Sequence, residues 1–168
     1  MYTTTIDTPP GRFTIIASDD AVLASGWTDD AERLRLLIGP ALRPDSLTPR
    51  EELGPFTRAV EAYVAGDAAA IDAVPVAQDA SPFLLRAWAE LRRIPPGLPE
   101  TYTQLAASSG NPAAVRAAGS ACARNPLALF VPCHRIVRTD GSLGGFAYGL
   151  DVKTWLLDHE QQAVAAAA

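Results

Sequence analysis

The chain has 168 residues, of which 48% are hydrophobic and 20% are charged, and its formal net charge at pH 7 is −5. This size suits one domain or two small ones with a packed core, and the hydrophobic fraction argues against wholesale disorder. No apolar run approaches the roughly 18 residues of a membrane span, and the first residues do not resemble a signal peptide. We therefore expect a cytoplasmic protein without a membrane span, whose acidic balance taken alone argues against DNA binding.

The first part of the chain is expected to form short strands joined by turns. Hydrophobic and polar residues alternate in three segments, which predicts a small antiparallel sheet. These segments are residues 2–6, 12–17 and 22–27. Helical periodicity predicts helices over residues 31–38 and 56–65, and a weaker pattern predicts a further strand over residues 71–76.

A domain boundary is expected near Ser81, which gives two domains, residues 1–81 and 82–168. The first has six basic and thirteen acidic residues, a net charge of −7, and the second has eight and six, a net charge of +2. This asymmetry indicates different partners for the two parts, although acidic residues could equally serve only to keep the first part soluble. Beyond the boundary the pattern becomes helical, with Ser81 expected to cap a helix that has Pro82 at its first position.

Two short helices separated by a glycine turn are expected next. Residues 101–107 predict the first helix, residues 108–110 the turn, and Asn111-Pro112 the start of a second helix over residues 113–123. This is the outline of a helix-turn-helix, although many helix pairs of this kind bind no DNA. A last helix is expected after Asp151, which would cap it, and its alanine-rich tail from Val164 onward is expected to fray. Its expected inward face consists of Val152, Trp155, Leu156 and His159.

A cysteine next to a histidine is the strongest chemical signal. Cys133 and His134 follow an apolar run, residues 127–130, and Pro132 restricts the backbone just before the thiol. A free thiol is only a few per cent thiolate at neutral pH, so a nucleophilic cysteine needs a base or a cation nearby. The alternative is that Cys133 is merely a small buried residue, as many cysteines are.

The few cysteines and histidines make a metal site or a disulfide framework improbable. The chain has Cys122, Cys133, His134 and His159, without a CxxC or HxxxH pair, whereas structural zinc needs four ligands at loop-closing spacings. We expect no metal and no cofactor, and we expect Cys122 to be a replaceable core residue.

The second half resembles the O6-alkylguanine-DNA alkyltransferase family over most of residues 82–160. The resemblance is carried by several motifs at matching spacing. They are Ile94-Pro95, Tyr102, Gln104-Leu105-Ala106, Gly110-Asn111-Pro112, residues 114–118, Asn125-Pro126, Pro132-Cys133-His134-Arg135, Gly141, Leu143-Gly144-Gly145-Phe146, Lys153-Thr154-Trp155-Leu156-Leu157 and Glu160. It implies an α/β (α+β) fold, with a ribonuclease-H-like N-terminal lobe of sheet and helices and a C-terminal helical lobe with a helix-turn-helix.

The resemblance also implies an activity, that of a methylated-DNA–protein-cysteine S-methyltransferase. Such a protein removes an alkyl group from O6-alkylguanine in DNA, with O4-alkylthymine as a second candidate substrate, and keeps it irreversibly on its own Cys133. His134 would take the thiol proton through a water, and Glu160 would hold the imidazole in the required tautomer. Tyr102 would donate a proton or a hydrogen bond to the guanine ring as it leaves. Arg135 is expected to be structural.

The resemblance assigns further residues to the pocket for the damaged base. Asn125 would brace the turn that presents the acceptor, and backbone carbonyls at the acceptor and at Ile136 would accept from the guanine amino group. The pocket loop departs from the family pattern at Phe146, Ala147 and Tyr148. We expect the added ring of Tyr148 to point into the pocket and to exclude large alkyl groups such as benzyl.

The expected partner is double-stranded DNA, bound through the minor groove with the damaged base flipped out. Arg116 would fill the space that the base leaves, and the small residues Ala114 and Ala117 would let the second helix approach closely, with Tyr102 also contacting DNA. We expect a monomer. Two other functions remain open: an alkyltransferase-like protein that only binds the lesion, against which the presence of Cys133 argues, and a Cys-His hydrolase that would use His159.

Overall fold

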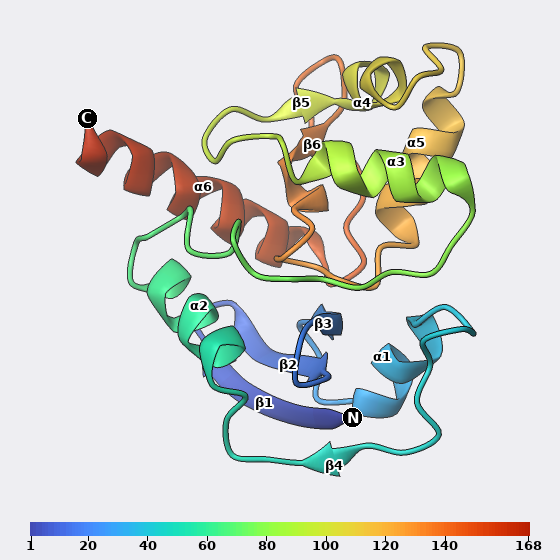
Figure 1. Ribbon diagram of the computed structural model, residues 1–168. Coiled ribbons are helices and arrows are strands. Elements are labelled where there is room, and N and C mark those ends of the chain that lie inside the picture. Colours follow the sequence, from blue (N-terminus) through green and yellow to red (C-terminus); the bar gives the residue numbers. More distant parts are fainter. The chain divides into compact units, whose positions relative to one another are not determined.

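The computed structural model describes residues 1–168, and their contacts divide the chain into two compact units (Figure 1). Unit 1 contains Met1–Asp79 and Pro126–Phe130, and unit 2 contains Ala80–Asn125 and Val131–Ala168. The first change of unit therefore lies two residues from the boundary expected at Ser81. No helix has the length and apolar character that crossing a membrane requires.

Unit 1 is built on a four-stranded sheet with the order β3-β2-β1-β4, in which β1 pairs antiparallel with β2 and parallel with β4. The three predicted strands and both predicted helices of this part are confirmed. The elements are β1 (Tyr2–Thr8), β2 (Gly11–Ala17), β3 (Val22–Gly26), α1 (Ala31–Leu37), β4 (Thr48–Pro49) and α2 (Pro55–Val64).

The central strand β2 is buried on both faces from Phe13 to Ala17, although alternation predicts one exposed face. It lies between β1 and β3, and α1 contacts both β2 and β3. A strand covered on both faces has an almost continuous apolar sequence, as Ile15-Ile16-Ala17 has here.

Unit 1 also contains a segment from far along the sequence, Pro126–Phe130. It lies beside β3, where Ser25 donates its backbone N–H to the Pro126 carbonyl at 2.8 Å and its hydroxyl to the Ala128 carbonyl at 2.8 Å. Leu129 in this segment has φ 77°, a left-handed conformation that is rare for a residue with a side chain. Such backbone strain persists only where the surrounding contacts hold it, and Leu129 is fully buried.

The strand expected over residues 71–76 is wrong. The chain there forms successive turns, with Val74 N–H donating to the Ile71 carbonyl, and only Val76 makes an isolated bridge, to Val22. Pro75 lacks a backbone N–H and cannot contribute a donor to a ladder, which limits the pairing to this one position.

Unit 2 is mainly helical, with one short parallel strand pair, β5–β6. Its elements are α3 (Pro82–Leu91), β5 (Glu100–Thr101), α4 (Tyr102–Ser108), α5 (Val115–Ala123), the short 3₁₀ helix η1 (Cys133–Arg135), β6 (Ile136–Val137) and α6 (Leu150–Ala167). Together with unit 1, this arrangement confirms the expected mixed α/β fold class, including the pair of helices α4 and α5 with a turn between them.

The turn of the helix pair follows its glycine signal. Gly110 has φ 88° just after α4, and the Asn111 N–H returns to the Ala106 carbonyl at 3.1 Å, a helix-ending bond that a left-handed residue makes possible. The second helix begins at Val115 and not at residue 113, because the Asn111 side chain accepts from the Ala113 N–H and closes a separate turn first. Asn111 therefore caps a turn and not the helix.

Two helix starts and one helix end differ from expectation. Ser81 occupies the cap position of α3 but its side chain makes no capping bond. Helix α6 begins at Leu150, after Gly149 in a left-handed conformation, and it continues as helix to Ala167. Trp155 and His159 lie half-buried and stack on each other at 4.5 Å. The buried face of α6 consists instead of Val152, Lys153, Leu156 and Glu160.

Candidate active site

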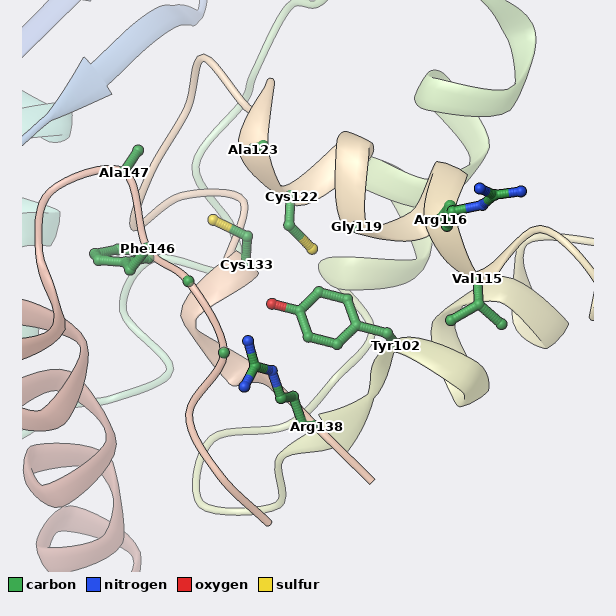
Figure 2. A pocket seen from close by; sticks show the side chains of 12 residues that line it. Tyr102, Val115, Arg116, Gly119, Cys122, Ala123, Cys133, Arg138, Phe146 and Ala147 are labelled. Atoms are coloured by element: carbon green, nitrogen blue, oxygen red, sulfur yellow. The ribbon is translucent and has the colours of Figure 1, made fainter. Parts of the chain in front are cut away.

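A cavity of about 590 Å³ opens in unit 2 between α5, the start of α4 and the loop that follows β6 (Figure 2). Four kinds of residue surround it: small or aliphatic residues, two aromatic residues, two arginines and the candidate acceptor. The lining consists of Tyr102, Val115, Arg116, Gly119, Cys122, Ala123, Cys133, Arg138, Gly144, Gly145, Phe146 and Ala147. It contains no acidic residue.

Cys133 opens η1 at the wall of this cavity and is 7% exposed. The Asn125 amide donates to the Val131 carbonyl at 2.8 Å and to Cys133 Sγ at 3.2 Å, so one side chain holds both the turn and the sulfur. Burial raises the pKa of Cys133, and the Asn125 hydrogen bond and the Lys153 charge oppose that rise. The resting group is therefore a thiol whose proton has to leave during any nucleophilic attack.

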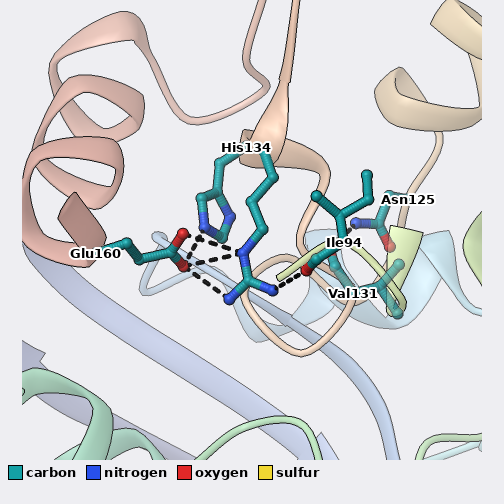
Figure 3. A network of polar contacts seen from close by, with 6 residues as sticks. Ile94, Asn125, Val131, His134 and Glu160 are labelled. Atoms are coloured by element: carbon teal, nitrogen blue, oxygen red, sulfur yellow. Dashed lines mark hydrogen bonds and ion pairs between the residues drawn. The ribbon is translucent and has the colours of Figure 1, made fainter. Parts of the chain in front are cut away.

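Behind the cysteine lies a buried polar network centred on Glu160 (Figure 3). His134 Nε2 lies 2.8 Å from Glu160 Oε1, and Arg135 donates to the same carboxylate from Nε at 3.0 Å and from Nη2 at 2.9 Å. Arg135 also donates to the Ile94 carbonyl at 2.6 Å. The side chains of His134, Arg135 and Glu160 are almost wholly inaccessible, so each charge is paired inside the unit.

The charges of this network follow from its geometry. Burial raises the pKa of Glu160, but the attraction and hydrogen bonds of His134 and Arg135 outweigh burial and bring it to about 2. The attraction of His134 requires an imidazolium, whereas the hydrogen bonds and the charge of Arg135 lower the pKa of Glu160 in either protonation state of His134. Burial lowers the pKa of His134 despite the carboxylate, and the imidazole is neutral near pH 7.

A neutral His134 donates from Nε2 to Glu160, which leaves Nδ1 as a proton acceptor. Nδ1 is buried and has no hydrogen-bond partner in the protein. A buried acceptor of this kind is commonly satisfied by a water. The structure thus brings His134, the residue after Cys133 in η1, together with Glu160, and the polar contacts include no direct bond between His134 and Cys133.

Tyr102 is the first residue of α4, after a capping box formed by Thr101 and Gln104. Its ring projects into the cavity (Figure 2), and burial raises the pKa of its phenol, which keeps its proton at neutral pH. Gly144 lies so close that an added Cβ would come 2.7 Å from the phenol oxygen, and its φ is 69°. A side chain at this position would displace the Tyr102 phenol and would strain the backbone, and glycine avoids both.

Sequence reasoning assigned no role to Lys153, which the structure places under the cavity loop. It is fully buried on α6, and its ammonium donates to the carbonyls of Ile136 at 2.6 Å, Leu143, and Gly145 at 3.4 Å. A lysine has three donors on a compact head, which suits three convergent carbonyls. One signal could have identified it: Lys153 is the single lysine beside thirteen arginines, and it adjoins the apolar face of its helix.

The predicted DNA-contacting residues lie at the start of the second helix of the pair. Arg116 is exposed and lines the cavity, and Ala117 is half-exposed beside it on α5. Ala114 precedes the first turn of α5 and is also half-exposed. These small side chains leave the backbone of the helix start accessible.

The predicted pocket residues divide into two groups. Phe146 and Ala147 line the cavity, whereas Ile136 and Tyr148 do not. Ile136 is fully buried, and its carbonyl already accepts from Lys153. The Tyr148 ring contacts Phe146 edge-on at 5.8 Å between ring centroids. The Tyr148 ring is therefore not part of the cavity lining, which differs from the expectation that it points into the pocket as a steric gate.

Cys122 is also placed differently from expectation, because it lines the cavity on α5 and does not lie in the core. Burial raises its pKa far above the ordinary thiol value, which makes it a neutral part of the wall. No group of three or more His, Cys, Asp and Glu side chains has an arrangement that could hold a metal ion.

Comparisons with known proteins agree on one family. Residues 82–162 match the model of the 6-O-methylguanine DNA methyltransferase DNA-binding domain. A methylated-DNA–protein-cysteine methyltransferase of Shigella flexneri is 35% identical over 158 residues, 92% of each chain, and one of Methanosarcina acetivorans is 34% identical over 95% of this chain and 98% of its own.

A solved structure described as Mycobacterium tuberculosis OGT in complex with DNA superposes with a TM-score of 0.81 at 28% identity, and covers 97% of this chain and 94% of its own. Because curated relatives above 30% identity align along almost the whole sequence, the chain belongs to the methylated-DNA–protein-cysteine methyltransferase family.

Proposed function

We propose that this protein repairs DNA by transferring an alkyl group from O6-alkylguanine to Sγ of its own Cys133. The observation that supports this most directly is the position of Cys133: its thiol lies at the wall of a cavity, and the buried pair of His134 and Glu160 follows it. The lining is largely apolar and small, which suits a flat base entering edge-first. O4-alkylthymine is a second candidate substrate for the same reaction.

The reaction is one displacement at carbon. The sulfur forms a bond to the alkyl carbon while the bond from that carbon to O6 breaks, and its electron pair stays on the guanine. The thiol proton passes through a water to Nδ1 of His134, and Glu160 stabilises the imidazolium that forms. A proton returned to the guanine completes its ordinary structure, so no other reactant is required.

Tyr102 and Asn125 act on the two ends of this displacement. The Tyr102 phenol, protonated at neutral pH, donates to the guanine as negative charge develops on the ring. Asn125 holds the sulfur through its amide and steadies the turn that presents it. The resulting thioether has no group nearby that could cleave it, so each molecule acts once, as a monomer on one lesion.

Access to the lesion requires the base to leave the duplex, at a cost of a few kcal/mol. We propose that α5 enters the minor groove, with Ala114 and Ala117 allowing close approach and Arg116 filling the vacated space. Non-specific groove binding suits a search for damage at any sequence. The net charge of the second half of the chain, +2, favours this contact over the acidic first half.

The test is incubation with excess duplex that contains O6-methylguanine, followed by intact-protein mass measurement and peptide mapping. We expect one methyl group on Cys133 and product formation that plateaus near one equivalent of protein. Cys133→Ser should transfer nothing yet retain DNA affinity. Binding without a mass gain would leave only a lesion-binding role, and continued turnover would indicate a hydrolase. The hydrolase has little support, because its histidine, His159, stacks on Trp155 outside the cavity lining.

A second prediction concerns the base-flipping role of Arg116. Arg116→Ala should slow repair of duplex DNA by roughly 10- to 100-fold more than repair of the free base O6-methylguanine, because only the duplex requires compensation for unstacking. Single-turnover transfer rates on the two substrates measure the difference. An equal loss on both would mean that Arg116 acts through folding or through its charge alone.

A further inference from the structure

The rim of the cavity has an electrostatic character opposite to that of the whole protein. The chain has a net charge of −5, yet the cavity lining contains two arginines and no carboxylate. One of them, Arg116, has a role in the proposed function. The second, Arg138, has none, and it stands on a different element, in the segment after β6.

Arg138 has an anchored backbone and an unpaired side chain. Its N–H donates to the Ser142 carbonyl at 2.9 Å, and its own carbonyl accepts from Gly141 at 2.9 Å, which closes a tight turn. The nearest acid along the loop, Asp140, is occupied by the Ser142 N–H at 2.9 Å and the Ser142 hydroxyl at 2.7 Å. The guanidinium is exposed and takes part in none of the ion pairs of the structure.

The Arg138 side chain lines the cavity. In Figure 2 the Tyr102 ring projects between α5, which carries Arg116, and the segment that carries Arg138. Two cations from separate elements thus flank the residue that faces the base. A flipped nucleotide rotates about its backbone, so its phosphates stay at the mouth of a pocket while the base enters.

We propose that Arg138 binds a backbone phosphate of the flipped nucleotide and so holds the nucleotide in the cavity. An arginine presents paired N–H donors in a plane that matches two phosphate oxygens, and such charge-assisted bonds are roughly twice as strong as neutral ones. This inference rests on the proposed function and adds a binding residue to it. Arg116 and Arg138 then have separate tasks: the first acts in the duplex and the second on the extruded nucleotide.

The experiment compares Arg138→Ala, Arg138→Lys and the control Arg12→Ala, which removes an equal charge from an exposed position on β2 of unit 1. Affinity for a duplex containing O6-methylguanine is measured as a function of salt in a Cys133→Ser background, which keeps the lesion intact. Arg138→Ala should weaken binding about 10-fold at low salt and reduce the slope of log affinity against log salt by about 0.9, the value for one phosphate contact. Arg138→Lys should retain most of the slope.

Transfer rates with the acceptor cysteine present complete the test. Arg138→Ala should slow transfer from duplex DNA much more than transfer from the free base, which has no phosphate. An equal loss on both substrates would overturn the proposal and assign Arg138 to the base itself or to Tyr102. An unchanged salt slope, or one that falls as much in Arg12→Ala, would also overturn it. Failure of the proposed function would show separately, as the absence of methylated Cys133 in the unmodified protein.

Discussion

Replacement of Glu160 by glutamine is expected to destabilise the protein by about 3–5 kcal/mol and to abolish most alkyl transfer. The substitution removes the negative charge that pairs with Arg135 inside unit 2, and loss of one partner of a buried ion pair leaves the other uncompensated. It also removes the carboxylate that receives the Nε2 proton of His134 and would stabilise the imidazolium. Urea unfolding and single-turnover transfer measure the two effects.

The matched control is Glu90→Gln, because Glu90 pairs with Arg93 at the surface, where the Arg93 side chain is 77% exposed. Exposed pairs of this kind contribute about 0–1 kcal/mol. We therefore expect little change in Glu90→Gln. If both variants lose the same small amount of stability, the Glu160 network is not the buried structural centre described above.

The lowered pKa of Glu160 also predicts how the free energy of unfolding depends on pH. Its pKa is about 2 in the folded protein and near the ordinary 4.5 when unfolded, so the unfolded chain binds the proton more readily. The contribution of Glu160 to the free energy of unfolding is complete above about pH 5 and is lost as pH falls towards 2. The unmodified protein should lose more stability over this range than Glu160→Gln does, and equal pH profiles would contradict the assignment.

Replacement of Lys153 by methionine should reduce transfer by about 100-fold or more, on free base and duplex alike. The change leaves the carbonyls of Ile136, Leu143 and Gly145 without their shared donor, and the loop that walls the cavity loses its anchor. Displacement of a positioning element by about 1 Å can cost a reaction roughly that factor. Faster amide hydrogen exchange in residues 141–149 would report the released loop directly.

Lys153→Arg should fail as well, because a larger planar guanidinium cannot replace a compact ammonium among three carbonyls in a fully buried site. Thr154→Ala, at the exposed neighbouring position on α6, is the control and should leave both the rate and the exchange unchanged. Normal transfer by Lys153→Arg would mean that only the positive charge matters and that the carbonyl geometry does not.

Local sequence determined much of this protein. Alternation located the strands of unit 1, and glycine and proline signals located the turn of the helix pair. Secondary structure of this kind depends on side-chain periodicity and turn chemistry, which are both local. The Pro132-Cys133-His134-Arg135 motif identified the acceptor segment and the family, since its residues are adjacent in the chain. Cys133 and His134 therefore needed no tertiary information to be singled out.

Other features depend on contacts between distant residues, and only the tertiary structure decided them. Helical periodicity placed Trp155 and His159 on the inner face of α6, but the buried face is the one with Lys153 and Glu160. A periodicity argument assigns polar side chains to the exposed face, because burial of a polar group is favourable only where hydrogen-bond or ion-pair partners are present. Those partners, Arg135 for Glu160 and the carbonyls of Ile136 and two loop residues for Lys153, lie 8 to 25 residues away.

The same physical reason explains the remaining differences. Cys122 has the spacing of a core residue on α5, and whether that face meets protein or a cavity is set by the loop across from it. The Tyr148 ring makes a favourable edge contact with Phe146 and does not line the cavity. Pro126–Phe130 joins unit 1 through bonds to Ser25, about a hundred residues earlier. Sequence identifies which residues can make such contacts, and only the folded chain selects which of them form.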